Sequence, residues 1–170
     1  MRIFLIGYMG CGKSRWGKII AEHYGFRFID LDTHIEEREN ATIPEIFSQH
    51  EESGFRLIEH EALESIREEE NVIIATGGGA PCFHNNMETM NSLGTTLFVE
   101  CSPQLLQERI SNSDNERPLV MHLSEDELLK YIIRHLNNRI PFYEQAQYKL
   151  VSGNLEIENF TAILDPIIKS

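Results

Sequence analysis

The chain has 170 residues and a formal net charge of −12, and 41% of its residues are hydrophobic. This length and composition are typical of one globular domain with its own core. The acidic balance argues against a nucleic-acid-binding protein, and no apolar run is long enough to span a bilayer, so neither nucleic acid nor a membrane is an expected partner. The three cysteines, Cys11, Cys82 and Cys101, lack metal-ligand spacing and are odd in number. This favours a reducing, cytoplasmic location, and a monomer is expected.

A glycine-rich loop follows the first predicted strand, at residues 2–6. Residues 7–14 read Gly-Tyr-Met-Gly-Cys-Gly-Lys-Ser, and a helical pattern begins at Lys13 and stops at Gly25. This strand, loop and helix form the sequence signature of a phosphate-binding P-loop. Lys13 can reach the β- and γ-phosphates of a nucleotide, and Ser14 can offer its hydroxyl to Mg²⁺. Cys11, inside this loop, is either a reactive thiol or a small residue that fills space.

Strand-like and helix-like segments alternate along the rest of the chain. Further strands are expected at 26–31, 72–75, 95–100 and 149–151, and helices at 44–49, 54–70, 83–93, 103–111, 124–147 and 158–169. This alternation predicts an α/β fold with a mostly parallel sheet.

The second predicted strand ends in Asp30-Leu31-Asp32. The alternation of side chains along a strand would place both carboxylates on one side, at the sheet edge where α/β proteins bind ligands. One carboxylate could then hold Mg²⁺, while the other orients or deprotonates an attacking hydroxyl. The alternative is an Asp-rich turn that caps a helix.

Gly77, Gly78 and Gly79 follow the third predicted strand. Consecutive glycines here predict a close approach of the backbone to a ligand, and a flexible turn is the alternative. A long connection at about 111–123 contains Arg117-Pro118 and joins two predicted helices. It is a candidate mobile lid, with an ordinary surface loop as the alternative.

Four arginines are candidates to bind anions because a guanidinium pairs with carboxylate or phosphate through two hydrogen bonds. Each of them, taken singly, is more often a surface residue. They are Arg56, Arg109, Arg117 and Arg139.

Together these motifs resemble the shikimate kinase family. In chain order they are Gly7-x4-Gly12-Lys13-Ser14, Asp30-Leu31-Asp32, Ile46-Phe47, Gly54-Phe55-Arg56-x2-Glu59, Thr76-Gly77-Gly78-Gly79, Arg117-Pro118-Leu119 and Arg139-x3-Tyr143-x2-Ala146. The resemblance implies a P-loop NTPase fold of the nucleoside-monophosphate-kinase type, a three-layer αβα domain over 1–170 with a five-stranded parallel sheet. It also implies a substrate-binding insert at about 33–60 and a mobile lid at about 111–123.

The implied reaction transfers the γ-phosphoryl group of ATP, with Mg²⁺, to the 3-hydroxyl of shikimate. The products are shikimate 3-phosphate and ADP, in the chorismate pathway to the aromatic amino acids. Lys13, Asp32 and Arg117 would be catalytic, and Ser14 and Asp30 would hold the metal. ATP would contact Gly10, Cys11, Gly12, Lys13, Ser14, Arg15, Arg109, Arg117 and Asn154. Shikimate would contact Asp32, Phe47, Phe55, Arg56, Gly77, Gly78, Gly79 and Arg139.

Two positions depart from the family pattern: Arg15 stands where Thr is frequent, and Glu51-Glu52 stands where Gly-Glu is expected. Three other functions remain open at this stage. They are another small P-loop kinase such as a gluconate kinase, a nucleoside-monophosphate kinase, and a nucleotide-binding module without catalytic activity.

Overall fold

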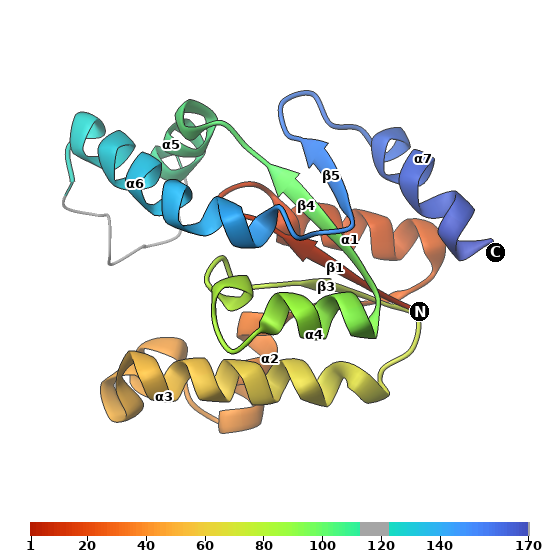
Figure 1. Ribbon diagram of the computed structural model, residues 1–170, viewed down its shortest axis with the longest axis horizontal. Helices are drawn as coiled ribbons and strands as arrows, with labels where there is room; N and C mark the ends of the chain where they lie inside the picture. Colours follow the sequence, from red (N-terminus) through yellow and green to blue (C-terminus); the bar gives the residue numbers. More distant parts are fainter. Residues whose placement is uncertain (113–122, 170) are drawn as a thin grey trace.

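Five parallel strands form the central sheet of the computed structural model, which describes residues 1–112 and 123–169 (Figure 1). The strands are β1 (Arg2–Ile6), β2 (Arg27–Asp30), β3 (Val72–Ala75), β4 (Thr95–Glu100) and β5 (Tyr148–Val151), in the spatial order β2-β3-β1-β4-β5. Nearly all residues of β1, β3 and β4 are buried, as in a parallel sheet covered on both faces. Because every pair is parallel, the carboxyl ends of the strands share one edge.

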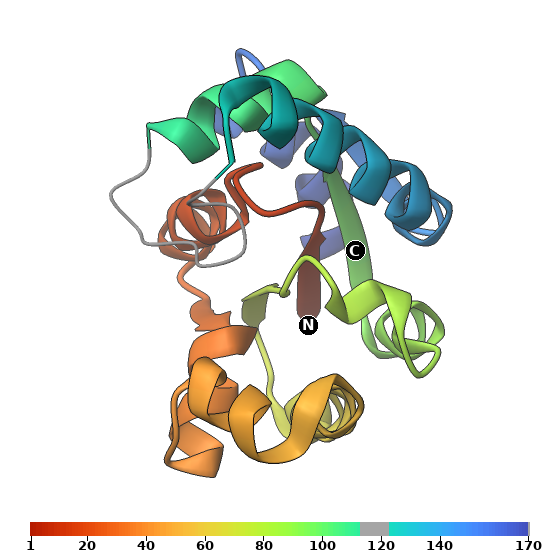
Figure 2. The ribbon, with the colours of Figure 1, turned by 90° about the vertical axis from the view of Figure 1, so that its left-hand side faces the viewer.

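Helices cover both faces of this sheet and complete the three layers. Helix α1 packs with α7 on one face, and α4 lies on the opposite face (Figure 2). Their bounds are α1 (Lys13–Tyr24), α2 (Leu31–Glu39), α3 (Ile43–Ser65), α4 (Asn86–Leu93), α5 (Pro103–Ser111), α6 (Glu125–Tyr143) and α7 (Ile157–Ile168), with 3-10 turns η1 (Ile66–Glu68) and η2 (Ala80–Cys82). Over the residues described, none of the helices has the length and apolar character needed to traverse a bilayer.

The predicted α/β architecture is confirmed, and β1, β3, β4 and α5 have the predicted bounds. Helix α2 was not predicted, because only Leu31 and Ile35 of its nine residues are buried and the apolar stripe is too short to reveal its period. Helix α4 begins three residues later than expected, after η2, and α6 ends at Tyr143 rather than at residue 147.

The sequence predicted separate helices at 44–49 and 54–70; in the structure a kink at Glu51 divides the single helix α3, which ends at Ser65 before η1. Glu51 has φ 56° and ψ −173°, a backbone conformation that suits glycine, which is the residue expected from the family pattern. The second segment, which carries Arg56, packs against α4 and η2.

Replacing Glu51 with glycine should stabilise the protein. Glu51→Gly removes the steric strain of the Cβ atom and should raise the free energy of unfolding by about 1–2 kcal/mol, measured by chemical denaturation. Ser48→Gly, in the regular part of the same helix, is the matched control and should lower that free energy by about 0.5 kcal/mol. Destabilisation by Glu51→Gly would show that Glu51 is not strained.

Candidate active site

The phosphate loop joins β1 to α1 at the carboxyl edge of the sheet. Gly7, Gly10 and Gly12 have φ values of 147°, 83° and 100°, which L side chains rarely adopt. A Cβ atom on Gly7 would lie 2.7 Å from the Val99 carbonyl oxygen and 2.9 Å from the Cys11 Sγ. The loop therefore needs glycine both to curl and to pack against β4.

Lys13 and Cys11 are both buried in this loop. The Lys13 ammonium donates to the carbonyl oxygens of Gly7 (2.8 Å) and Tyr8 (2.9 Å), so its positive charge is held over the loop. Cys11 is fully buried against Gly7, which favours the space-filling interpretation of its thiol. A phosphate would meet here a fixed cation, backbone N–H groups and the amino end of α1.

Ser14 and Asp30 form a hydroxyl–carboxylate pair beside Lys13. The Ser14 Oγ donates to the Asp30 Oδ2 at 2.6 Å. Such oxygens fit Mg²⁺, which usually takes one or two protein ligands and completes its shell with water and substrate phosphates. Among the residues that the structure describes, no three His, Cys, Asp or Glu side chains converge, so no all-protein metal cage competes with this arrangement.

Asp32 reaches the same edge by a different route from the one predicted. Asp30 ends β2 and caps α2, and its Oδ1 accepts from the Asp32 backbone N–H at 3.2 Å, so Asp32 lies in the first helical turn. The strand-alternation argument for the pair was therefore wrong, and the helix-cap alternative correctly describes Asp30. A Cβ atom on Gly77 would still lie only 2.9 Å from the Asp32 Oδ1, which places this carboxyl beside the triple-glycine loop.

The pKa of the Asp32 carboxyl is raised. The main cause is desolvation, because surrounding protein atoms displace much of the water around the carboxyl. The residue as a whole is still exposed to solvent. The negative charge of Asp30 adds to the increase, and the positive charge of Lys13 opposes it. Asp32 is therefore more ready to take up a proton than an ordinary surface aspartate.

Arg56 is held by acidic residues of its own helix. Its Nη1 donates to the Glu59 Oε2 at 2.8 Å, and its Nη2 donates to the Glu52 Oε1 at 3.3 Å. Glu59 is 1% exposed, and burial raises its pKa against the lowering effect of Arg56. The buried Arg56 Nε has no hydrogen-bond partner among the described residues. Glu59 and Glu52 use two of the five N–H donors of the guanidinium, so its terminal nitrogens keep N–H groups that a ligand could bind.

Arg139 and Arg56 converge on the triple-glycine loop from different elements. A Cβ atom on Gly78 would lie 3.4 Å from the Arg139 Nη1 and 3.2 Å from the Met9 backbone nitrogen. A Cβ atom on Gly79 would lie 2.7 Å from both terminal nitrogens of Arg56. Because these glycines have no side chains, the guanidinium groups carried by α3 and α6 can both approach the loop backbone. They meet at one rim of the sheet, beside the phosphate loop.

Two aromatic residues and two further arginines also belong to the predicted set. Phe47 and Phe55 stack with ring centroids 4.3 Å apart, Phe55 buried and Phe47 exposed. Arg109 binds the far side of the phosphate loop, where its Nη1 donates to the Cys11 carbonyl oxygen (3.2 Å) and the Ser152 Oγ (3.1 Å). Arg15 is exposed on α1, with its guanidinium 5.7 Å from the Trp16 ring centroid.

Asn154 and Arg117 are the two remaining residues that were predicted to contact ATP. Asn154 is exposed in the loop after β5, two residues beyond the Ser152 that Arg109 binds. Arg117 and most of the predicted lid at 111–123 lie outside the described residues. The sequence analysis gave Glu59 no separate role. Its position three residues after Arg56 could have indicated the ion pair, because side chains three apart on a helix are neighbours.

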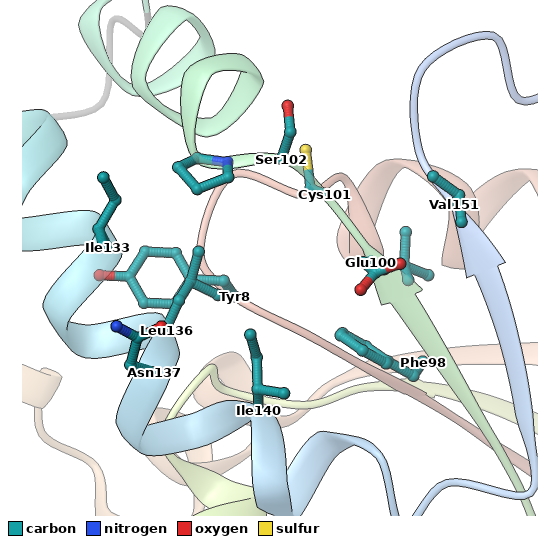
Figure 3. Close-up of a pocket in the computed structure, with 12 residues that line it drawn as sticks. Tyr8, Phe98, Glu100, Cys101, Ser102, Ile133, Leu136, Asn137, Ile140 and Val151 are labelled. Carbon is teal, nitrogen blue, oxygen red and sulfur yellow. The ribbon is translucent and has the colours of Figure 1, made fainter.

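An apolar groove of about 300 Å³ lies near this rim but differs from it in composition. Figure 3 shows the Tyr8 ring beside Ile133 and Leu136 of α6, across from Phe98 of β4. None of the residues predicted to bind ATP, Mg²⁺ or shikimate lines the groove. The converging charges, rather than this groove, mark the candidate active site.

Comparisons with known proteins agree with this geometry. A family model described as shikimate kinase matches residues 9–168. A shikimate kinase of Bacteroides thetaiotaomicron is 47% identical over 156 residues, covering 92% of this chain and 89% of that protein. A shikimate kinase of Flavobacterium johnsoniae is 39% identical over 167 residues, covering 96% and 97%.

Solved structures show the same similarity along the whole chain. A crystal structure of shikimate kinase from Bacteroides thetaiotaomicron aligns with a TM-score of 0.91 and 42% identity, covering 100% of this chain and 99% of that one. A shikimate kinase from Acinetobacter baumannii in complex with shikimate aligns with a TM-score of 0.83 and 32% identity, covering 99% and 93%.

Proposed function

The chain belongs to the shikimate kinase family, whose members phosphorylate shikimate with ATP and Mg²⁺ in aromatic biosynthesis, and we propose that its glycine-lined rim carries out this transfer at the 3-hydroxyl. The products would be shikimate 3-phosphate and ADP. The observation that carries the proposal is the convergence of Arg56 and Arg139 on Gly78 and Gly79 beside the phosphate loop. An acceptor with one carboxylate and several hydroxyls fits this combination of groups.

The acceptor is held on one side of the rim. Arg56 and Arg139 bind its carboxylate, and the backbone of Gly77, Gly78 and Gly79 approaches its ring. Asp32 binds the hydroxyls. The stacked pair of Phe47 and Phe55 lines the apolar side of the pocket. The close approach of both guanidinium groups to the glycines supports this placement.

The nucleotide is held on the other side. Its phosphates bind Lys13 and the backbone of Gly10, Cys11 and Gly12, while Arg15, Arg109 and Asn154 border the rest of the nucleotide. Ser14 and Asp30 hold Mg²⁺, which when bound neutralises charge on the β- and γ-phosphates. Arg117 remains a predicted contact of the transferring phosphate, on the lid at 111–123.

Catalysis consists mainly of positioning and charge stabilisation, since phosphoryl transfer needs little covalent help from the protein. Lys13 stabilises charge on the transferring group. Asp32, whose carboxylate is stabilised by the positive charge of Lys13, either accepts the proton of the attacking hydroxyl or orients that hydroxyl. The raised pKa of Asp32 supports the first role, because a base whose pKa lies nearer the working pH transfers protons more efficiently.

The remaining expectations concern the protein as a whole. We propose a single P-loop kinase domain over 1–170, with about 33–60, in α2 and α3, as the acceptor-binding insert and about 111–123 as the lid. The acidic net charge supports a protein that does not bind nucleic acid, and three free cysteines support a cytoplasmic location. A monomer is expected, and light scattering of the purified protein tests this.

An acceptor panel tests the proposed reaction. With ATP and Mg²⁺, ADP release should be rapid with shikimate and negligible with gluconate or a nucleoside monophosphate. Preference for gluconate would indicate a gluconate kinase. ATP binding without turnover on any acceptor would indicate a nucleotide-binding module without catalytic activity. The position of the new phosphate, identified by ³¹P and proton NMR of the product, should be the 3-oxygen.

Gly79→Ala should weaken acceptor binding selectively. Gly79 has φ −90°, which any residue adopts, so the effect of the new methyl group is steric. That methyl lies 2.7 Å from the Arg56 nitrogens and should displace them, raising the KM for shikimate about tenfold or more while the KM for ATP stays within about twofold. Steady-state kinetics measure both values. An unchanged KM for shikimate would place Arg56 outside the acceptor site.

A further inference from the structure

A tight turn at residues 80–86 follows the triple-glycine loop and folds back onto α3. It begins with η2 and contains two consecutive left-handed residues, His84 (φ 48°) and Asn85 (φ 54°). Such conformations are costly for residues other than glycine and persist only where the surroundings hold them. The turn brings three side chains to α3: Phe83, Asn86, and His84, whose ring centroid lies 5.6 Å from that of His60.

Phe83 covers the guanidinium group of Arg56. The Arg56 Cζ lies 4.3 Å from the Phe83 ring centroid, closer than its 5.2 Å distance to the Phe55 ring. The Arg56 side chain is only 11% exposed, so the ring replaces water over a charged group. A cation–π contact under such desolvation is among the stronger ones. Phe83 therefore restricts the plane in which the guanidinium lies.

Asn86 fixes the turn that carries Phe83. Asn86 is fully buried, and its Nδ2 donates to the Ala80 carbonyl oxygen at 2.8 Å. Its Oδ1 lies 2.7 Å from the Nδ1 of His60, one residue after the Glu59 that binds Arg56. One buried amide thus links the end of the triple-glycine loop to α3. Losing it would leave buried polar groups unpaired and free the turn to shift.

We propose that the turn at 80–86 positions Arg56 for the acceptor carboxylate, with Phe83 as a positioning residue and Asn86 as the anchor of the turn. This inference rests on the proposed function, since it assigns to Phe83 a task that exists only if Arg56 binds the acceptor. Glu59 and Glu52 hold the two terminal nitrogens of Arg56, and Phe83 holds its face. The guanidinium is thereby ordered before the acceptor arrives, which lowers the entropy cost of binding.

Substitutions at Phe83 test the proposal by separating the two KM values. Phe83→Ala should raise the KM and the calorimetric Kd for shikimate about five- to tenfold, with the KM for ATP within about twofold. Phe83→Leu keeps apolar cover without an aromatic ring and should show an intermediate effect. Phe83→Tyr keeps the ring and should restore the parent values. Equal values for Phe83→Leu and the parent protein would overturn the role of the ring.

Asn86→Ala tests the anchor and should raise the KM for shikimate in the same selective way. Matched controls lie elsewhere in the chain: Phe26, half-buried near Tyr24, and Thr96, a fully buried polar residue of β4. Phe26→Leu and Thr96→Ala should lower thermal stability without raising the KM for shikimate relative to that for ATP. A similar KM change in these controls would mean that general destabilisation explains the Phe83 and Asn86 effects, and would overturn the proposal.

A double-mutant cycle on kcat/KM for shikimate separates this inference from the proposed function. Phe83→Ala should have its full effect in the parent protein and almost none in Arg56→Ala. If Arg56→Ala leaves kcat/KM unchanged, the proposed acceptor site fails. If Arg56→Ala lowers kcat/KM but Phe83→Ala does not, or acts equally in both backgrounds, the positioning role of Phe83 fails while the proposed function stands.

Discussion

Asp32→Asn should lower kcat by about 10²- to 10⁴-fold, the range typical of a lost general base. The amide keeps the size of the carboxyl but can neither accept a proton nor bind a hydroxyl as strongly. ATP binding should change little, because Asp32 is placed on the acceptor side of the rim. Coupled steady-state kinetics give kcat, and calorimetry gives the Kd for ATP. Glu37→Gln, an exposed position on the same helix, is the control.

The same substitution should make the fold more stable. The pKa of Asp32 is raised in the folded protein, so at neutral pH its ionised carboxyl destabilises the folded state relative to the unfolded one. Asp32→Asn removes that effect and should raise the melting temperature at pH 7. The increase should disappear as the pH falls below the ordinary pKa of an Asp carboxyl, where Asp32 is protonated in both states. In the parent enzyme, kcat/KM should decrease as the pH falls through the raised pKa of Asp32. Turnover that survives Asp32→Asn would exclude both roles proposed for this carboxyl.

Arg139→Ala should cost about 2–5 kcal/mol in kcat/KM for shikimate, the range found when one partner of a buried charged pair is removed. Arg139 lies on α6 above the Tyr8 ring, and its Nη1 is close to the Gly78 backbone. Arg139→Lys keeps the positive charge but cannot form two parallel hydrogen bonds to a carboxylate. Its kcat/KM for shikimate should lie between those of the parent protein and Arg139→Ala.

The KM for ATP separates this effect from a general disturbance of α6. It should stay nearly constant in Arg139→Ala, because the nucleotide is placed on the other side of the rim. Arg134→Ala, an exposed position on the same helix, should leave all constants near the parent values. Unchanged kinetics on shikimate in Arg139→Ala would remove Arg139 from the acceptor site.

Much of the fold could be predicted because its signals are local. Strand β3 is wholly apolar, β1 is apolar after Arg2, and β4 has the apolar centre Leu-Phe-Val. Ser102 and Ser124 cap α5 and α6, as their sequence contexts suggest. Helix α2 escaped prediction because it buries only Leu31 and Ile35. Its absence from the predicted elements also produced the mistaken strand geometry for Asp32.

The site was predictable in composition but not in arrangement. The P-loop pattern identified Lys13 and Ser14 because one local loop supplies both. The meeting of Arg56 and Arg139 depends on a kinked α3, a distant α6 and the absence of side chains on the intervening glycines, and no local pattern encodes that distance. Phe83 gave no signal at all, since a single aromatic residue in a loop is most often part of the core.

The most direct measurement is a crystal structure of the protein with ADP, Mg²⁺ and shikimate bound together. The shikimate carboxylate should lie between the guanidinium groups of Arg56 and Arg139, with its 3-hydroxyl beside Asp32 and facing the phosphate end of ADP at Lys13. A carboxylate bound away from both arginines, or a ring whose 3-hydroxyl points away from the phosphate loop, would contradict the convergence of donor and acceptor on this rim.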